Sequence, residues 1–345
     1  MTSREIIKRI INHDDPPRIG FDFLGRDSNN RENPRDLQWG ATAKLVRPDS
    51  EILGTWNRNP ALTSRVPWFS GELMMTPMGD IYGRLGGKTK GECIKGALQD
   101  GWELLDSWAL PVIDENEAKK FEAAGYRDSD KYILGGFQFA VFSSLRDCRH
   151  MDNALMDTIL EPDNIKLFLD KIMGLAVQIL DRAYKNGVDG IMMADDMGTQ
   201  INLFFSPETF RNIFKPYYKK IAAEVHDRGM HFFLHSCGKI YGIINDLIEA
   251  GVDVFQFDQP ELSGSGILAR EFGHSAAFYS PVDIQKIMST GDRFLIEEGA
   301  LNMVNSFKGC GGSLIAKDYP GWHDIDVEDE WAKWARDVII ANAVI

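Results

Sequence analysis

The stretch HFFLHSC at residues 231–237, followed by Gly238, decides the fold of this chain. Its apolar run stops at a glycine, which is typical of a buried strand that ends in a turn. Strand side chains repeat every two residues, so we expect His235 and Cys237 on the same side at the strand's carboxyl end. Zinc favours imidazole nitrogen and cysteine sulfur, so the pair predicts two zinc ligands. The alternative interpretation is a buried histidine beside a structural cysteine.

Predicted strands and helices alternate around this stretch. Apolar residues at helical spacing predict a helix over 163–186, and Ser206 with Pro207 predicts the start of another, which Pro216 should kink. Such alternation favours a parallel sheet, and therefore an α/β fold. The best fit is a (β/α)8 TIM barrel, with the eighth strand expected in the first third of the chain. Six further strands are predicted, at 19–23, 132–139, 187–196, 254–260, 275–283 and 312–318.

Residues 24–130 do not follow this pattern, because they are rich in Gly, Pro, Asn and charge and have only short strand signals, AKLVR at 43–47 and GDIYGRL at 79–85. We expect them to form an irregular excursion that caps one end of the barrel. The chain is then one barrel domain over 1–345, with its regular part at 131–345. The tryptophans of the first third are expected to pack within the cap rather than stack on a substrate: Trp39, Trp56, Trp68, Trp102 and Trp108.

The composition excludes several classes of protein. The formal net charge of the 345 residues is -13, which argues against a nucleic-acid partner. Four scattered cysteines do not predict a disulfide framework. The N-terminus, with a short helix expected at 3–13 and Ser3 as its cap, lacks the apolar core of a secretory signal. No stretch is apolar enough to span a membrane, so we expect a cytoplasmic protein. Glycine-rich phosphate-binding motifs are also absent from the sequence.

Polar residues gather at the predicted strand ends, where a TIM barrel carries its chemistry. Asp195 and Asp196 end one strand, Asp258 another and Tyr279 a third, and these four are the predicted catalytic residues. Asp195 and Asp196 cannot both point inward, because successive strand residues face opposite sides. Helix capping or a solvated loop is the alternative role for each carboxylate.

Three segments resemble the uroporphyrinogen decarboxylase superfamily, and most of all its branch of methyltransferases that work with corrinoid proteins. They are GVDGIMMADDMGTQ (187–200), FFSPETFRNIFKPYYKKI (204–221) and the run from Phe232 to Glu261. The segments REIIKRIINHDDPPRIGFDF (4–23) and ALQDGWELLDSWALP (97–111) are similar to it as well. The resemblance implies a (β/α)8 barrel, in agreement with the strand pattern. It also implies zinc as cofactor and a corrinoid (cobalamin-type) cofactor carried by a partner protein.

The methyltransferase branch carries an HxCG element as zinc ligands, which His235, Cys237 and Gly238 match. Its third ligand is a cysteine just after the last barrel strand, but Cys310 precedes that strand here, and we expect it to be a packing or turn residue. The third ligand therefore stays open between Cys310, Asp318, His323 and another carboxylate.

The decarboxylases of the superfamily hold substrate carboxylates with an arginine-rich N-terminal segment. This chain has Arg18 and Arg26 there but lacks the arginine–glycine pattern. The resemblance therefore implies methyl transfer between a small substrate and a corrinoid, with a metal-free decarboxylase or a non-catalytic binding barrel as alternatives. Aromatic residues near the strand ends favour a donor with an aromatic or apolar body, such as a methoxylated aromatic: Phe137, Phe139, Phe204, Phe205, Tyr279 and Trp322.

Overall fold

A computed structural model describes residues 1–345 except 27–29, 41, 49–55, 87–90, 117–118 and 120–124. Among the described residues, the main sheet has eight strands in the order β1-β13-β12-β11-β10-β9-β8-β2, and its neighbouring strands are parallel. These strands are β1 (Gly20–Asp22), β2 (Leu37–Gly40), β8 (Tyr132–Phe137), β9 (Gly190–Ala194), β10 (His231–His235), β11 (Val254–Gln256), β12 (Ala277–Ser280) and β13 (Leu314–Lys317).

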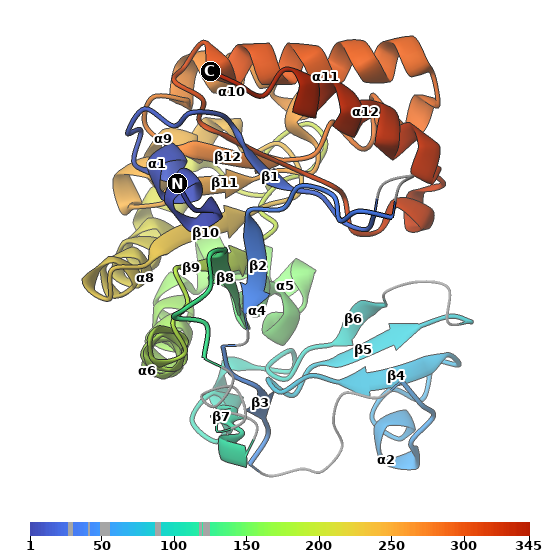
Figure 1. Cartoon of the computed structure of the whole chain (residues 1–345). Coiled ribbons are helices and arrows are strands. Elements are labelled where there is room, and N and C mark those ends of the chain that lie inside the picture. The colour runs from blue at the N-terminus through green and yellow to red at the C-terminus, as the bar shows by residue number, and fades with distance from the viewer. Residues whose placement is uncertain (27–29, 41, 49–55, 87–90, 117–118, 120–124) are drawn as a thin grey trace.

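The two ends of this sheet meet. The backbone N–H of Asp36 donates to the carbonyl of Phe21 over 2.6 Å, which joins β1 to the segment before β2. The sheet is therefore a nearly closed barrel of the TIM type, and the predicted fold class is confirmed (Figure 1). The seven predicted strands all belong to it. The eighth is Leu37–Gly40, which the sequence pattern did not identify.

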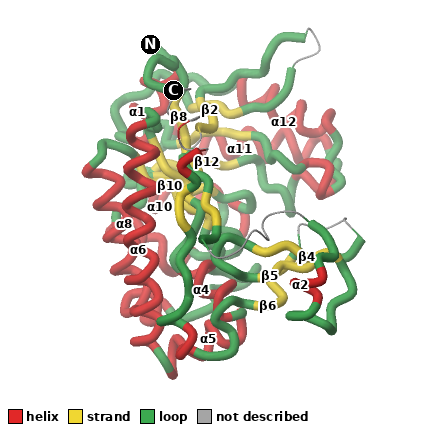
Figure 2. Tube along the Cα trace, turned by 90° about the horizontal axis from the view of Figure 1, so that it is seen from below, coloured by secondary structure: helices red, strands yellow, loops and turns green. Residues whose placement is uncertain are grey.

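Helices follow most of the strands and lie outside the barrel, as α6 and α8 show in Figure 2. The helices outside the barrel are α4 (Phe142–Arg149), α5 (Met151–Leu160), α6 (Pro162–Lys185), α7 (Pro207–Thr209), α8 (Lys215–Asp227), α9 (Ile244–Ala250), α10 (Ser265–Phe272), α11 (Arg293–Lys308) and α12 (Asp329–Ala341), whereas α1 (Ser3–Ile11) precedes the first strand. Ser206 caps α7 as predicted. A π-helical segment at Phe210–Phe214 separates α7 from α8, so the expected disturbance lies just before Pro216. Among the described helices, none is long and apolar enough to cross a membrane.

The barrel interior is filled from its amino end by α1. Four isoleucines of this helix are buried and pack with the inward side chains of the strands, among them Phe233 of β10. Gly20 permits the close approach, because a Cβ there would lie 2.6 Å from Ile7 Cδ1. The N-cap of α1 is Thr2, one residue before the predicted Ser3, and it forms a capping box with Glu5. Helix α1 thus occupies the amino end of the barrel, and the pocket beside His235 lies at the carboxyl end.

The described part of the excursion between β2 and β8 contains two small antiparallel sheets. One pairs β3 (Leu45–Val46) with β7 (Val112–Ile113), and the other contains β4 (Glu72–Met75), β5 (Ile81–Arg84) and β6 (Glu92–Lys95), near α2 (Pro60–Thr63). The two short strand signals predicted here are therefore β3 and β5. Figure 1 shows the excursion beside the barrel, below β2 and β8.

Tryptophan packing and hydrogen bonds to α4 fix the excursion against the barrel. Trp108 is buried, stacks on Phe168 of α6 with 5.4 Å between ring centroids, and donates from Nε1 to the Met78 carbonyl. Tyr82 donates to the Asp147 carboxylate over 2.6 Å. Trp102 and Trp108 thus pack as predicted, and Trp56 lies under the Arg84 guanidinium. Trp39 differs, because it belongs to barrel strand β2 and is 43% exposed. Trp68 is also exposed, at 66%.

Asp80 in this excursion makes the stability of the protein depend on pH. Burial raises the pKa of its carboxyl from 3.8 to about 6, against the opposing hydrogen bonds from Ala97 and Thr76. The folded state therefore holds a proton that the unfolded state releases, and stability falls as pH rises from about 4 through 6, by roughly 2–3 kcal/mol. We expect Asp80→Asn to gain about this much relative to wild type between pH 4 and 7 in urea unfolding. Parallel stability curves for the two proteins would contradict this assignment.

Candidate metal centre at the barrel mouth

The register of β9 against β10 brings the central site residues together. Ala194 pairs with His235, and the backbone N–H of Asp195 donates to the His235 carbonyl over 2.8 Å. Asp196 and Cys237, each two residues beyond this pair, therefore lie side by side at the carboxyl end of the strands. Gly238 then turns the chain at φ +79°, where a Cβ would lie 2.1 Å from the Gly198 carbonyl oxygen.

Asp196, His235 and Cys237 form a cluster that can hold a metal ion. One ligand atom from each lies within 4.8 Å of the others. His235 Nε2 is 3.5 Å from Cys237 Sγ and 3.5 Å from Asp196 Oδ1. A tetrahedral zinc ion with bonds of about 2.0–2.3 Å separates its ligand atoms by roughly 3.3–3.7 Å. The set of one oxygen, one nitrogen and one sulfur also suits zinc, so the residues fit this ion and leave a fourth position open.

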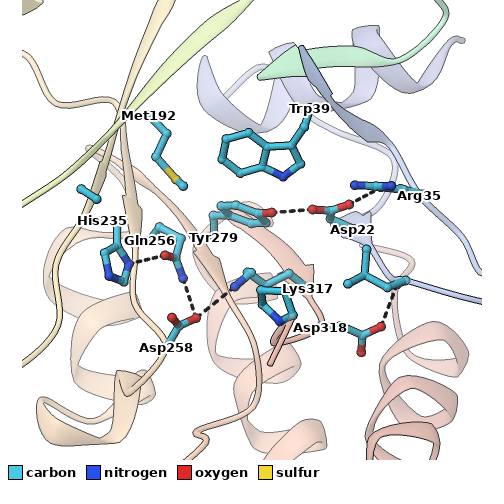
Figure 3. A pocket seen from close by; sticks show the side chains of 13 residues that line it. Asp22, Arg35, Trp39, Met192, His235, Gln256, Asp258, Tyr279, Lys317 and Asp318 are labelled. Carbon is cyan, nitrogen blue, oxygen red and sulfur yellow. Dashed lines mark hydrogen bonds and ion pairs between the residues drawn. The ribbon is translucent and has the colours of Figure 1, made fainter. Parts of the chain in front are cut away.

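Behind the cluster, a chain of hydrogen bonds orients the imidazole (Figure 3). His235 Nδ1 contacts the amide oxygen of buried Gln256. Gln256 Nε2 donates to Asp258 Oδ1 over 2.8 Å, and Lys317 Nζ donates to the same oxygen over 3.0 Å. Burial opposes ionisation of Asp258, but the charge of Lys317 and its hydrogen bond outweigh burial and hold the pKa of this carboxyl below its usual value. An ionised Asp258 accepts from the Gln256 amide nitrogen and so fixes the orientation of that amide. The Gln256 oxygen then accepts a hydrogen bond from His235 Nδ1, which leaves the lone pair of His235 Nε2 directed toward the cluster.

Replacing Gln256 with leucine tests this chain of hydrogen bonds. The leucine has a similar volume but cannot accept the Nδ1 proton, so the imidazole loses its fixed orientation. We expect zinc affinity, measured by competition with a chromogenic chelator, to fall about 10–100-fold while the fold is kept. Gln256→Glu keeps an acceptor at this position and serves as the control. Unchanged affinity in Gln256→Leu would contradict the orienting role.

A pocket of about 330 Å³ opens beside His235 at the carboxyl end of the barrel. Its charged groups pair with one another: Arg35 Nε lies 2.6 Å from Asp22 Oδ1, and Lys317 binds Asp258. The Tyr279 hydroxyl donates to the other oxygen of Asp22. Burial and the Asp22 charge raise the pKa of Tyr279 well above its usual value, so this phenol stays protonated. The remaining wall is largely apolar, with Trp39, Met192, Ala194 and Pro320.

The predicted site residues fall into different places. His235, Asp258 and Tyr279 line the pocket, and Asp196 and Cys237 adjoin it in the metal cluster. Asp195 is fully buried: its carboxylate accepts from the N–H groups of Val141, Phe142 and Ser143 and from Tyr218. Burial raises the pKa of Asp195. These contacts favour a structural role for Asp195 at the start of α4, and a direct part in catalysis stays a prediction.

The candidates for a third zinc ligand differ in their distance from His235 and Cys237, and one carboxylate lies in the cluster. The carboxylate that joins His235 and Cys237 is Asp196, which was predicted as a catalytic residue. Cys310 is buried before β13, and its thiol donates to the Ala269 carbonyl, in agreement with a packing role. Asp318 binds Arg336 and the Leu24 amide. The His323 side chain is 84% exposed and faces Asp329. Neither these two nor Cys310 belongs to the cluster found among the described residues.

The N-terminal arginines pair with carboxylates, and several of the expected aromatic residues pack on other aromatic rings. Arg18 binds Asp36 over 2.7 Å, and Arg26 faces Glu32, so neither lines the pocket. Phe204 and Phe205 pack on Phe142, and Trp322 packs on Tyr319. Phe137 and Phe139 line a second, larger cavity.

Four residues of the site were missed: Asp22, Arg35, Gln256 and Lys317. Asp22, Gln256 and Lys317 are the polar last residues of otherwise apolar strands, GFD, VFQ and LIAK. That position is itself a signal, because a buried polar side chain in a barrel strand needs a partner inside the barrel. Arg35 lies in the irregular segment before β2, and no pattern in the sequence marks it.

Comparisons with known proteins agree with the fold. The family model described as Uroporphyrinogen decarboxylase (URO-D) matches residues 127–271, which span β8 to α10. Residues 127–271 are therefore similar to the uroporphyrinogen decarboxylase family, in agreement with the resemblance seen in the sequence.

Among solved structures, a methyltransferase from Methanosarcina mazei is similar over 99% of both chains, with a TM-score of 0.64 and 14% sequence identity. A D-psicose 3-epimerase from Clostridium cellulolyticum H10, solved with D-tagatose, matches 70% of this chain and 86% of its own, with 12% identity and a TM-score of 0.39. The similarity to the Methanosarcina mazei structure covers nearly the whole chain, so the common fold includes the excursion. No curated protein matches this chain significantly.

Proposed function

We propose that this protein is a zinc-dependent methyltransferase that passes a methyl group between a small substrate and the cobalt of a corrinoid protein. The observation that carries the proposal is the cluster of Asp196, His235 and Cys237 beside a pocket at the barrel mouth. The match to the uroporphyrinogen decarboxylase family and the shared fold with an archaeal methyltransferase support it.

In this proposal, Asp196, His235 and Cys237 hold the zinc ion. When bound, zinc would supply a Lewis acid that activates the heteroatom from which, or to which, the methyl group moves. Gln256 keeps His235 in the tautomer that a metal ligand needs. Trp39, Met192 and Tyr279 form an apolar wall that keeps water from the reacting methyl carbon. The chain's own groups thus position the substrate, and the open mouth gives the corrinoid partner access.

The pocket disfavours the decarboxylase alternative for a tetrapyrrole. Its two basic residues, Arg35 and Lys317, are already paired with Asp22 and Asp258 inside the pocket. A substrate with many carboxylates would need basic groups that are free to bind them. A small substrate whose reacting end is uncharged suits this pocket better.

Methyl transfer can be tested with free cobalamin in place of the corrinoid protein. Zinc-loaded protein is mixed either with cob(I)alamin and methoxylated aromatics or with methylcobalamin and small thiols, and the cobalt species is followed by its absorbance. We expect transfer in one of the two directions with wild type, and none with His235→Ala. Equal rates in wild type, His235→Ala and a blank without protein would contradict the proposal.

A further inference from the structure

A second cavity, of about 810 Å³, lies where the excursion meets the barrel. Residues of the excursion between Thr42 and Asp80 form one side, and residues 136–147 of β8, α4 and the turn between them form the other. Ala194 at the end of β9 lines both this cavity and the pocket beside the metal cluster. The side chain of Ala194 is small and exposed, and the two cavities adjoin each other at this residue.

Two residues that line the second cavity, Ala194 and Ser143, are neighbours of the metal cluster. Ala194 pairs in register with His235 and precedes Asp196 by two residues. Ser143 lines the cavity, and its Oγ accepts the backbone N–H of Asp196 over 3.1 Å. A molecule in this cavity can therefore extend past Ala194 and present one end to the cluster.

The wall of the cavity suits a flat apolar group. Phe137 and Phe139 are buried, with ring centroids 4.5 Å apart and planes inclined by 46°. Met78 and Leu45 add apolar surface from the excursion. Aromatic rings favour such tilted and offset neighbours, and the thioether of methionine also packs well on ring edges.

One charged group of the wall, Lys44, can bind an anion. The Asp147 carboxylate is paired with Arg146 over 3.0 Å and accepts from Tyr82. Asp80 is buried, and its oxygens accept from Ala97 and Thr76. Lys44 is exposed, lines the cavity, and has no ion-pair partner among the described residues. Gln138 holds the adjacent backbone, because its Nε2 donates to the Ala43 carbonyl over 2.7 Å.

We propose that the second cavity is a subsite for the body of the substrate, and that this body is an aromatic carboxylate. The ring lies against Phe137 and Phe139, the carboxylate binds the Lys44 ammonium, and the end that carries the methyl group passes Ala194 to the metal cluster. This inference rests on the proposed methyl transfer for the role of that end, but binding of the body does not depend on turnover.

Binding of two probes to the zinc-loaded protein tests the subsite. Calorimetry with 4-methoxybenzoate and with methoxybenzene compares a ring with and without the anion. We expect wild type to bind 4-methoxybenzoate at least about tenfold more tightly, as one charge-assisted hydrogen bond predicts. Lys44→Gln should reduce this preference to about twofold or less, whereas Lys166→Gln on the exposed face of α6 should leave it unchanged. Equal affinity of wild type for the two probes, or no binding of either, would overturn the inference.

A second, independent measurement tests the passage, by which we mean the place at Ala194 where the methyl-carrying end would pass from the second cavity to the metal cluster. Ala194→Leu places a larger side chain where the two cavities meet, and Ala194→Ser is the matched control. We expect the leucine variant to retain zinc and to bind 4-methoxybenzoate at least about tenfold more weakly, because the methoxy end loses its place. Unchanged affinity in this variant would overturn the passage. Tight binding that depends on Lys44, without methyl transfer in any assay, would contradict the proposed function alone, and methyl transfer without dependence on Lys44 would contradict the subsite alone.

Discussion

The Cys237→Ala variant is expected to lose bound zinc and methyl transfer together while it keeps its fold. Cys237 is exposed at the carboxyl end of β10, so its thiol contributes little to packing, but its Sγ lies 3.5 Å from His235 Nε2 in the cluster. Loss of contacts behind a metal ligand already weakens affinity about 10–100-fold, so loss of the ligand itself should weaken it by at least about 100-fold. Zinc affinity, circular dichroism and turnover of the same preparation give the three readings.

The matched control for this variant is Cys310→Ser. Cys310 lies before β13 and donates to the Ala269 carbonyl, which a serine hydroxyl can also do. We expect it to keep full zinc and full activity. Undiminished metal and turnover in Cys237→Ala would refute the role of the thiol, and loss of zinc in Cys310→Ser would reopen the choice of third ligand.

Asp195→Ala is expected to destabilise the fold strongly, by about 3–5 kcal/mol. The substitution leaves the backbone N–H groups of Val141, Phe142 and Ser143 and the Tyr218 hydroxyl without their acceptor in a buried place. Each buried donor without a partner costs about 1–3 kcal/mol, and local rearrangement recovers part of the sum. Urea unfolding measures the loss directly.

The neighbouring Asp196→Ala variant is the control for Asp195→Ala, because the two adjacent carboxylates have opposite surroundings. Asp196 is half-buried and accepts from the Cys237 amide at the edge of the cluster. We expect this variant to lose about 1 kcal/mol of stability or less, but to lose zinc affinity. Equal loss of stability in the two variants would contradict the separation of a structural and a metal-binding carboxylate.

The barrel itself could be predicted because its strands are long or strongly apolar. HFFLHSC has buried Phe232 and Leu234 facing the helices, and His235 facing inward as the two-residue period requires. β2 could not be found in this way. LQWG has four residues, of which only Leu37 is buried, and its place in the barrel depends on pairing with β8 more than ninety residues further along the chain. No residue pattern in the local sequence predicts that pairing.

The site shows the same division. His235 and Cys237 follow from the period of one strand, whereas Asp196 joins them only through the register between β9 and β10. The sequence left the third ligand open between Cys310, Asp318, His323 and another carboxylate. Which of the two adjacent aspartates faces the cluster depends on the packing of the other one against α4 and Tyr218. The pairs Asp22–Arg35 and Asp258–Lys317 join segments 13 and 59 residues apart, and only the closed barrel brings them together.

Zinc content tests the proposed metal centre most directly. Wild type and His235→Ala are purified without chelator, incubated with excess zinc, desalted, and analysed for metal and protein in the same samples. We expect about one zinc per chain in wild type and close to none in the variant. Wild type without zinc after this treatment, or a variant that retains it fully, would contradict a metal centre formed by Asp196, His235 and Cys237.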